Sequence, residues 1–153
     1  MESGPRTILI AFAVPIVLCC GGGYFLLSSA VEGKGRKARE FGDQVVQAVT
    51  SAEGWDAAAL RSMGTEQYQK TNSVSELSAT VTSEAARTLG TYVSGVSSVK
   101  IIGTGDGKQT GTQVEYESRV KFTRGKARLK LQLELAAPGS SKWAVSSFNV
   151  TPY

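Results

Sequence analysis

Few side chains in this sequence can carry out nucleophilic, acid–base or metal chemistry. The chain contains no histidine, which excludes Ser-His-Asp and Cys-His nucleophile systems, histidine bases and histidine metal ligands. Its two cysteines, Cys19 and Cys20, are adjacent within an apolar segment. No thiol is left in the rest of the chain for a disulfide, a redox motif or a zinc site. Any chemistry must therefore come from carboxylates, tyrosines and cations.

The carboxylates show no pairing that would suggest acid–base catalysis or a metal cage. Asp43 and Asp56 fall on the polar faces of predicted helices, and Asp106 falls in a predicted turn. The glycine-rich stretch 103–107 is not a phosphate-binding loop, because a strand rather than a helix is predicted to follow it. Tyr116 is the one ionisable side chain predicted to face the interior. We therefore predict no catalytic residues, no bound cofactor and no metal.

The cations form two groups that are the candidate contact residues. The first group follows the apolar segment and consists of Lys34, Arg36, Lys37 and Arg39. The second group lies on one predicted hairpin and consists of Arg119, Lys121, Arg124, Lys126, Arg128 and Lys130. An acidic protein surface or anionic lipid would suit such groups. Nucleic acid is not expected, because no aromatic side chain alternates with these cations to stack on bases. The alternative is a solvated strand edge whose charges prevent edge-to-edge pairing.

The first part of the chain is predicted to be a membrane anchor. From Thr7 to Val31 the sequence has no Asp, Glu, Lys or Arg, which is long enough for a transmembrane helix. We assign residues 1–31 to an N-terminal tail and this anchor. A cleaved signal peptide and a lipidated Cys19 or Cys20 are the alternatives.

The orientation of the anchor is left open by the residues themselves. The cations just after the span outnumber Arg6 before it, which by the positive-inside rule keeps the following domain in the cytoplasm. A composition rich in Ser and Thr and free of thiols suits the opposite orientation.

Residues 32–153 are enough for one domain with one core, and its first half has helical patterns. Gly33 to Gly35 is predicted to be a hinge. An amphipathic helix follows, with an apolar stripe that consists of Phe41, Val45, Ala48 and Val49. We predict a second helix from Trp55 to Met63, a loop from Thr65 to Thr71, and a third helix from about Ser75 to Leu89. The third helix begins with the capping box Ser73-x-x-Glu76 and ends before Gly90.

After Gly90 the apolar period changes to two, which predicts strands near 96–102, 114–122, 127–135 and 142–150. A phase slip in the last strand predicts a bulge near Ser146 and Ser147. Glu115 and Glu117 are expected to pair across to Arg128 and Lys130. The predicted fold class is α+β: an N-terminal transmembrane helix followed by a roll of about three helices packed on a four-stranded antiparallel sheet.

Three short motifs in this order carry a resemblance to a known fold. They are Gly54-Trp55-Asp56-Ala57-Ala58 followed by Tyr68, then Ser75-Glu76-Leu77, and finally Ser141-Lys142-Trp143-Ala144-Val145. The chain resembles the cystatin-like and nuclear-transport-factor-like α+β roll domains, in particular small membrane-anchored bacterial versions of unassigned function. The resemblance covers nearly the whole chain, implies no catalytic set, and favours an extracytoplasmic domain.

We therefore expect a single-pass membrane protein whose domain, residues 32–153, is a non-catalytic binding or assembly module. It would recognise a protein partner or a small ligand through the basic hairpin or the mouth of the roll. One alternative is a module that binds anionic lipid through both groups of cations. The other is an enzyme of the roll fold, which would need a pocket at Tyr116.

Overall fold

The structure is a computed structural model that describes residues 32–103, 112–136 and 140–153. Residues Gly35–Tyr153 form one compact unit. Within the described ranges, no helix is both long and apolar enough to cross a membrane. The predicted tail and anchor, residues 1–31, and the predicted turn after Gly103 lie outside the described residues.

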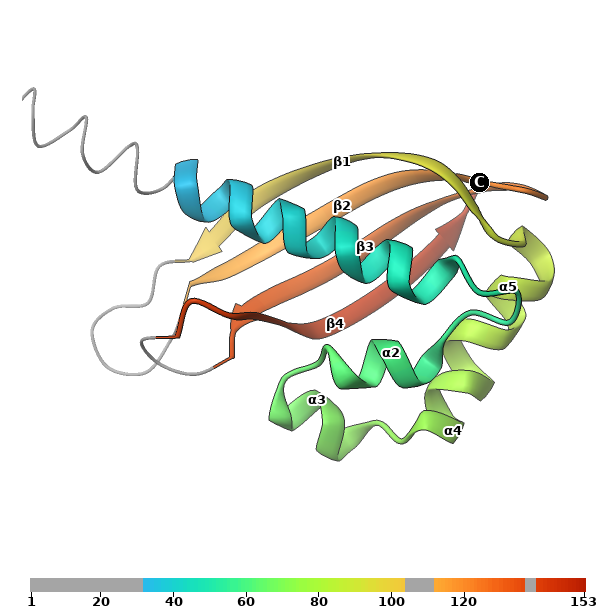
Figure 1. Cartoon of the computed structure of the whole chain (residues 1–153), viewed down its shortest axis with the longest axis horizontal. Coiled ribbons are helices and arrows are strands. Elements are labelled where there is room, and N and C mark those ends of the chain that lie inside the picture. Colours follow the sequence, from blue (N-terminus) through green and yellow to red (C-terminus); the bar gives the residue numbers. More distant parts are fainter. Residues whose placement is uncertain (1–31, 104–111, 137–139) are drawn as a thin grey trace, which may run out of the picture. The chain divides into compact units, whose positions relative to one another are not determined.

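Four strands form a single antiparallel sheet in the order β1-β2-β3-β4 (Figure 1). The strands are β1 (Tyr92–Gly103), β2 (Gln113–Phe122), β3 (Lys126–Leu135) and β4 (Trp143–Pro152). The predicted α+β class with a four-stranded antiparallel sheet is confirmed. Because each strand pairs with its neighbour in the sequence, β2 and β3 are central and β1 and β4 are the edges.

Alternation of apolar and charged residues determines which face of the sheet is buried. On β3, Ala127, Leu129, Leu131 and Leu133 are fully buried, while the charged residues between them are exposed. The predicted bulge in β4 is confirmed. Gln132 pairs with Ser147 and Leu133 pairs with Val145, so Ser146 is the extra residue.

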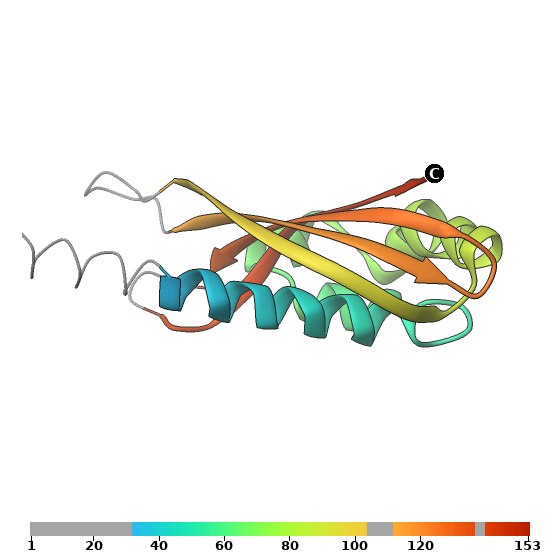
Figure 2. The same cartoon turned by 90° about the horizontal axis from the view of Figure 1, so that it is seen from above.

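A long helix over residues 32–50 lies along the buried face of the sheet (Figures 1 and 2). The predicted hinge at Gly33 to Gly35 is wrong, because these residues are helical. The predicted stripe also needs correction: Ala48 is exposed and Val46 is buried. The reason is a close contact at Gly42, where any side chain would overlap the ring of Tyr116. Glycine therefore lets this helix approach β2, at a cost in helix propensity of about 1 kcal/mol.

Trp55 forms the corner that follows the long helix. It has a φ of 52°, which is uncommon for a bulky residue. Its ring stacks on Phe122 with centroids 5.3 Å apart, and its indole nitrogen donates a hydrogen bond of 2.7 Å to the Gly90 carbonyl. These contacts hold the strained backbone. The second helix therefore begins after Trp55: α2 (Ala57–Ser62) has Asp56 as its N-cap.

The predicted loop from Thr65 to Thr71 is wrong, because this segment is α3 (Glu66–Thr71). The Thr65 side chain accepts a hydrogen bond from the Tyr68 amide, and Tyr68 is buried. The helical segment that follows consists of α4 (Val74–Leu77), a π-helical turn (Ser78–Thr82) and α5 (Ser83–Leu89). Its predicted capping box at Ser73 is confirmed, and it ends at Gly90, whose φ is +80°.

Candidate functional site

The hairpin of β2 and β3 presents most of its predicted cations on the sheet face that the helices leave uncovered. We call this surface the basic face. Its members are Arg119, Lys121, Lys126, Arg128 and Lys130, and all five are exposed. The residues between them along both strands are buried, so these cations point away from the core.

Strand register places like charges directly opposite each other on this face. Arg119 is opposite Arg128, and Lys121 is opposite Lys126. Such directly opposed pairs destabilise a sheet. Glu117 offsets part of the charge through ion pairs to Arg128 at 3.2 Å and to Lys130 at 3.6 Å. The expected cross-strand pairing is therefore confirmed for Glu117. Among the described residues, Glu115 forms no ion pair and lies opposite Lys100 and Gln132.

The central position of β2 and β3 removes the simplest structural explanation for these charges. Cations that protect a sheet from edge-to-edge pairing belong on edge strands. The edges of this sheet are β1 and β4, whereas the basic face lies on the two strands between them. The predicted role of these cations in edge protection is therefore wrong, whereas a basic face that is simply solvated stays an alternative prediction.

Arg124 belongs to the predicted group but not to the basic face. Its backbone amide donates to the Leu89 carbonyl at 2.8 Å, and its guanidinium donates to the Ala86 carbonyl at 3.3 Å. Both acceptors are terminal carbonyls of α5, which a cation satisfies well. Arg124 therefore has a structural contact that ties the β2–β3 turn to α5.

Three cations of the first predicted group, Arg36, Lys37 and Arg39, do not join the basic face. Arg36 forms an ion pair of 3.9 Å with Glu40, and the Arg39 guanidinium donates to the Ser97 hydroxyl at 3.1 Å. Arg36, Lys37 and Arg39 lie on the long helix, which covers the opposite face of the sheet. Lys34 is exposed and lies outside the compact unit. A flat surface that touches the basic face cannot also touch Arg36, Lys37 and Arg39.

Tyr116 is buried, as predicted, and its hydroxyl donates a hydrogen bond of 2.7 Å to the Asp43 carboxylate. The hydroxyl lies in a polar cavity of about 150 Å³ that is also lined by Arg39, Ser97 and Ser118. Burial, and next the hydrogen bond to Asp43, raise the pKa of Tyr116 well above its ordinary value. Tyr116 therefore stays protonated at neutral pH, and its hydrogen bond to Asp43 links the long helix to β2.

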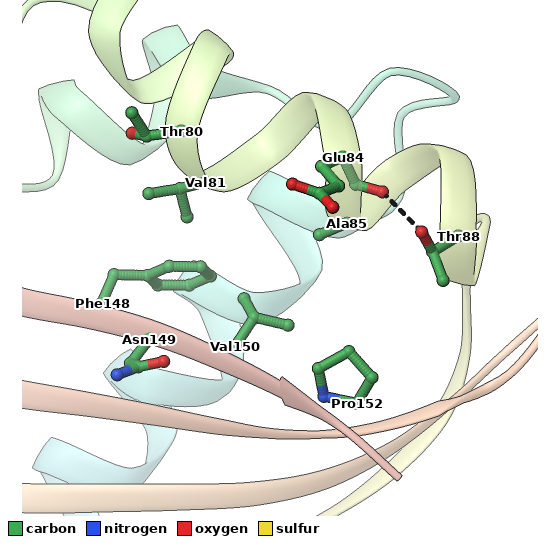
Figure 3. A pocket seen from close by; sticks show the side chains of 9 residues that line it. All are labelled: Thr80, Val81, Glu84, Ala85, Thr88, Phe148, Asn149, Val150 and Pro152. Carbon is green, nitrogen blue, oxygen red and sulfur yellow. Dashed lines mark hydrogen bonds between the residues drawn. The ribbon is translucent and has the colours of Figure 1, made fainter.

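Beside β4 the structure has two clefts that no sequence pattern indicated. One, of about 360 Å³, lies between α5 and the end of β4, with Val81 and Phe148 facing each other across it (Figure 3). The other, of about 380 Å³, lies towards α3 and is lined by Tyr68 and Leu77. Val81 and Phe148 line both clefts. The clefts arise where helical segments pack against β4, so a local sequence signal for them was absent.

Comparison with protein-family models, with curated protein sequences and with solved structures finds no match to this chain.

Proposed function

We propose that this chain is a membrane-anchored, non-catalytic binding module that recognises an acidic protein surface through the basic face. One observation carries the proposal: Arg119 opposes Arg128 and Lys121 opposes Lys126 on central strands of the sheet. This arrangement costs stability and has no role in edge protection. Carboxylates of an acidic partner would neutralise this repulsion on binding. The repulsion that destabilises the free protein would therefore favour the complex.

The chemistry of the basic face favours a protein over a nucleic acid. No aromatic residue is found at the outward-facing positions of β2 and β3, so bases have no platform for stacking there. Glu117 lies among the cations, half-buried and fixed by its two ion pairs, and would repel phosphates placed near it. A protein surface can instead place its own cation or hydrogen-bond donor at Glu117 and its carboxylates at the unpaired positions.

A titration of the full chain in lipid nanodiscs with a ten-residue oligoglutamate peptide tests the proposal. The variant Arg119→Glu with Lys121→Glu reverses two charges and leaves each new carboxylate opposite a cation, so it keeps the fold. We expect affinity to fall by about tenfold or more, because each reversal costs on the order of 1 kcal/mol. The control, Lys70→Glu with Arg87→Glu, makes the same charge change on α3 and α5 and should leave affinity within about twofold. Equal losses in both variants would refute recognition by the basic face.

The same titration separates the protein partner from the alternative of anionic lipid. Anionic lipid repels the acidic peptide from every variant, so the quantity compared is the ratio of the wild-type affinity to the affinity of Arg119→Glu with Lys121→Glu. If the basic face is free, this ratio should be the same in nanodiscs of neutral phosphatidylcholine and of anionic phosphatidylglycerol. If the face rests on lipid, the ratio should approach one in the anionic nanodiscs. That result would favour the lipid-surface module.

The membrane part of the proposal rests on the apolar sequence from Thr7 to Val31 and on the resemblance to anchored roll domains. We propose a single span with the folded unit outside the cytoplasm. A tag placed after Tyr153 should then be cleaved by protease in intact cells, or after opening of an outer membrane alone. Cleavage only after rupture of the inner membrane would reverse the orientation.

A further inference from the structure

The outer edge of β4 is a second candidate surface, independent of the basic face. At Val145 this edge already pairs with a neighbouring segment of the chain. Val145 donates to the Met63 carbonyl at 2.8 Å and accepts from the Thr65 amide at 2.9 Å, which forms a parallel bridge with Gly64. The segment then turns away into α3. From Ser147 to Pro152, no described residue donates to or accepts from this edge of the backbone.

The two clefts described above lie along this open part of β4. One cleft is bordered by Ser146 and Ser147, and the other by Val150 and Pro152, with Phe148 between them. An added strand would hydrogen-bond to the free edge, and its alternate side chains would lie about 7 Å apart on the side of the clefts. Val81 and Phe148 give both clefts an apolar part that can receive such side chains, while threonine and other polar residues line the rest (Figure 3).

The charge of the clefts indicates the chemistry of the occupant. Glu84 lines one cleft and Glu134 lines the other, and neither cleft is lined by a lysine or arginine. The hydroxyls of Thr80 and Thr88 are already used, because each donates to a backbone carbonyl of its own helical segment. Each cleft is therefore lined by one carboxylate and by no cation, which favours an occupant with cationic side chains.

We propose that the free edge of β4 and its two clefts bind an extended peptide segment with alternating apolar side chains and flanking lysine or arginine residues. The peptide backbone continues the pairing that Gly64 and Val145 begin. Its apolar side chains contact Phe148 and Val81, and its cations lie near Glu84 and Glu134. The proposal uses no residue of the basic face, so it holds or fails separately from the proposed function.

A defined peptide tests this site on the isotope-labelled full chain in a mild non-ionic detergent. The probe is the heptapeptide KTLTLTK, which in an extended strand has its lysines and leucines on one face, and the control is its isomer KTTLLTK, which has the same composition without the alternation. We expect KTLTLTK to shift the amide signals of Phe148, Val150 and Val81 with a Kd below about 1 mM. Amides of β4 between Ser147 and Pro152 should gain protection from hydrogen exchange.

Two variants test whether the peptide binds in the clefts. Glu84→Lys changes an exposed side chain and should weaken binding by about threefold or more, because it repels the flanking lysines. Ala85→Leu reduces the cleft shown in Figure 3 and should also weaken binding. The absence of shifts at 1 mM peptide would overturn the proposal. Equal binding of the two isomers, shifts that lie away from β4, or a dimer of the free chain that hides this edge would overturn it as well.

Discussion

Replacement of Arg119 by glutamate should stabilise the protein, although the change reverses a charge. Arg119 lies directly opposite Arg128. Two exposed charges at a separation of about 7 Å interact by about 0.6 kcal/mol in water before screening. The substitution converts this repulsion into an attraction of similar size. We therefore expect a gain of about 1 kcal/mol at low salt and about 0.5 kcal/mol near 0.15 M salt, where the Debye length is about 8 Å.

The same charge change at Lys100 provides a matched control on the same face of the sheet. Lys100 is exposed on β1 and lies directly opposite Glu115. Lys100→Glu therefore creates a like-charge pair where Arg119→Glu removes one, and it should cost about as much as the other variant gains. Net charge changes equally in both variants, so a general effect of net charge cannot produce opposite signs.

Urea denaturation of the full chain, followed by far-ultraviolet circular dichroism in non-ionic detergent, measures both variants. The midpoint should rise for Arg119→Glu and fall for Lys100→Glu with an unchanged slope. Both shifts should nearly vanish at 1 M salt, where the Debye length is about 3 Å. A loss of stability in Arg119→Glu, or a gain that salt leaves unchanged, would refute the electrostatic argument for the basic face.

The other predictions concern the contacts that hold the long helix and the helical segment after α3. Gly42→Ala should lower the free energy of unfolding by about 1 to 3 kcal/mol, because the added methyl group overlaps the Tyr116 ring. Gly33→Ala should raise it by up to about 1 kcal/mol, because no atom lies near this position. Chemical denaturation measures both changes. Burial and then Asp43 raise the pKa of Tyr116, so the folded state keeps a proton that the unfolded state loses above pH 10.0. Stability should therefore fall by up to about 1.4 kcal/mol per pH unit above that value, and Tyr116→Phe should make the fall shallower in the same denaturation series. Ser73→Ala removes the cap of α4 and should cost about 1 kcal/mol by thermal unfolding.

The sheet and the basic face were predictable because their signals are local. On β3 the cations Lys126, Arg128 and Lys130 are each followed by a buried apolar residue, and this period of two already places them on the outer face. The capping box at Ser73 is likewise contained in four residues. What the sequence could not provide is the register that places Arg119 opposite Arg128, because register depends on the β2–β3 turn as a whole.

Contacts between distant segments account for what was missed. Asp43 looked like a solvated residue on a helix, because its partner, Tyr116, is 73 residues away in the sequence. Arg124 looked like one more surface cation, because its acceptors belong to α5. Helix α3 lacks an apolar period and is held from outside: the Arg61 guanidinium donates to the carbonyls of Gln69 and Asn72, each at 3.0 Å. Thr65 followed by Glu66 was the available signal for its N-terminus.

Photo-crosslinking from the basic face in cells that make this protein tests the central claim most directly. Val96 lies beside Arg119 and is 76% exposed, so a benzophenone amino acid at this position leaves the core unchanged. We predict one dominant adduct with a protein whose crosslinked surface is rich in Asp and Glu, and we predict its loss in the variant Arg119→Glu with Lys121→Glu. Adducts only with lipid, or an adduct that persists in this variant, would contradict recognition of an acidic protein by the basic face.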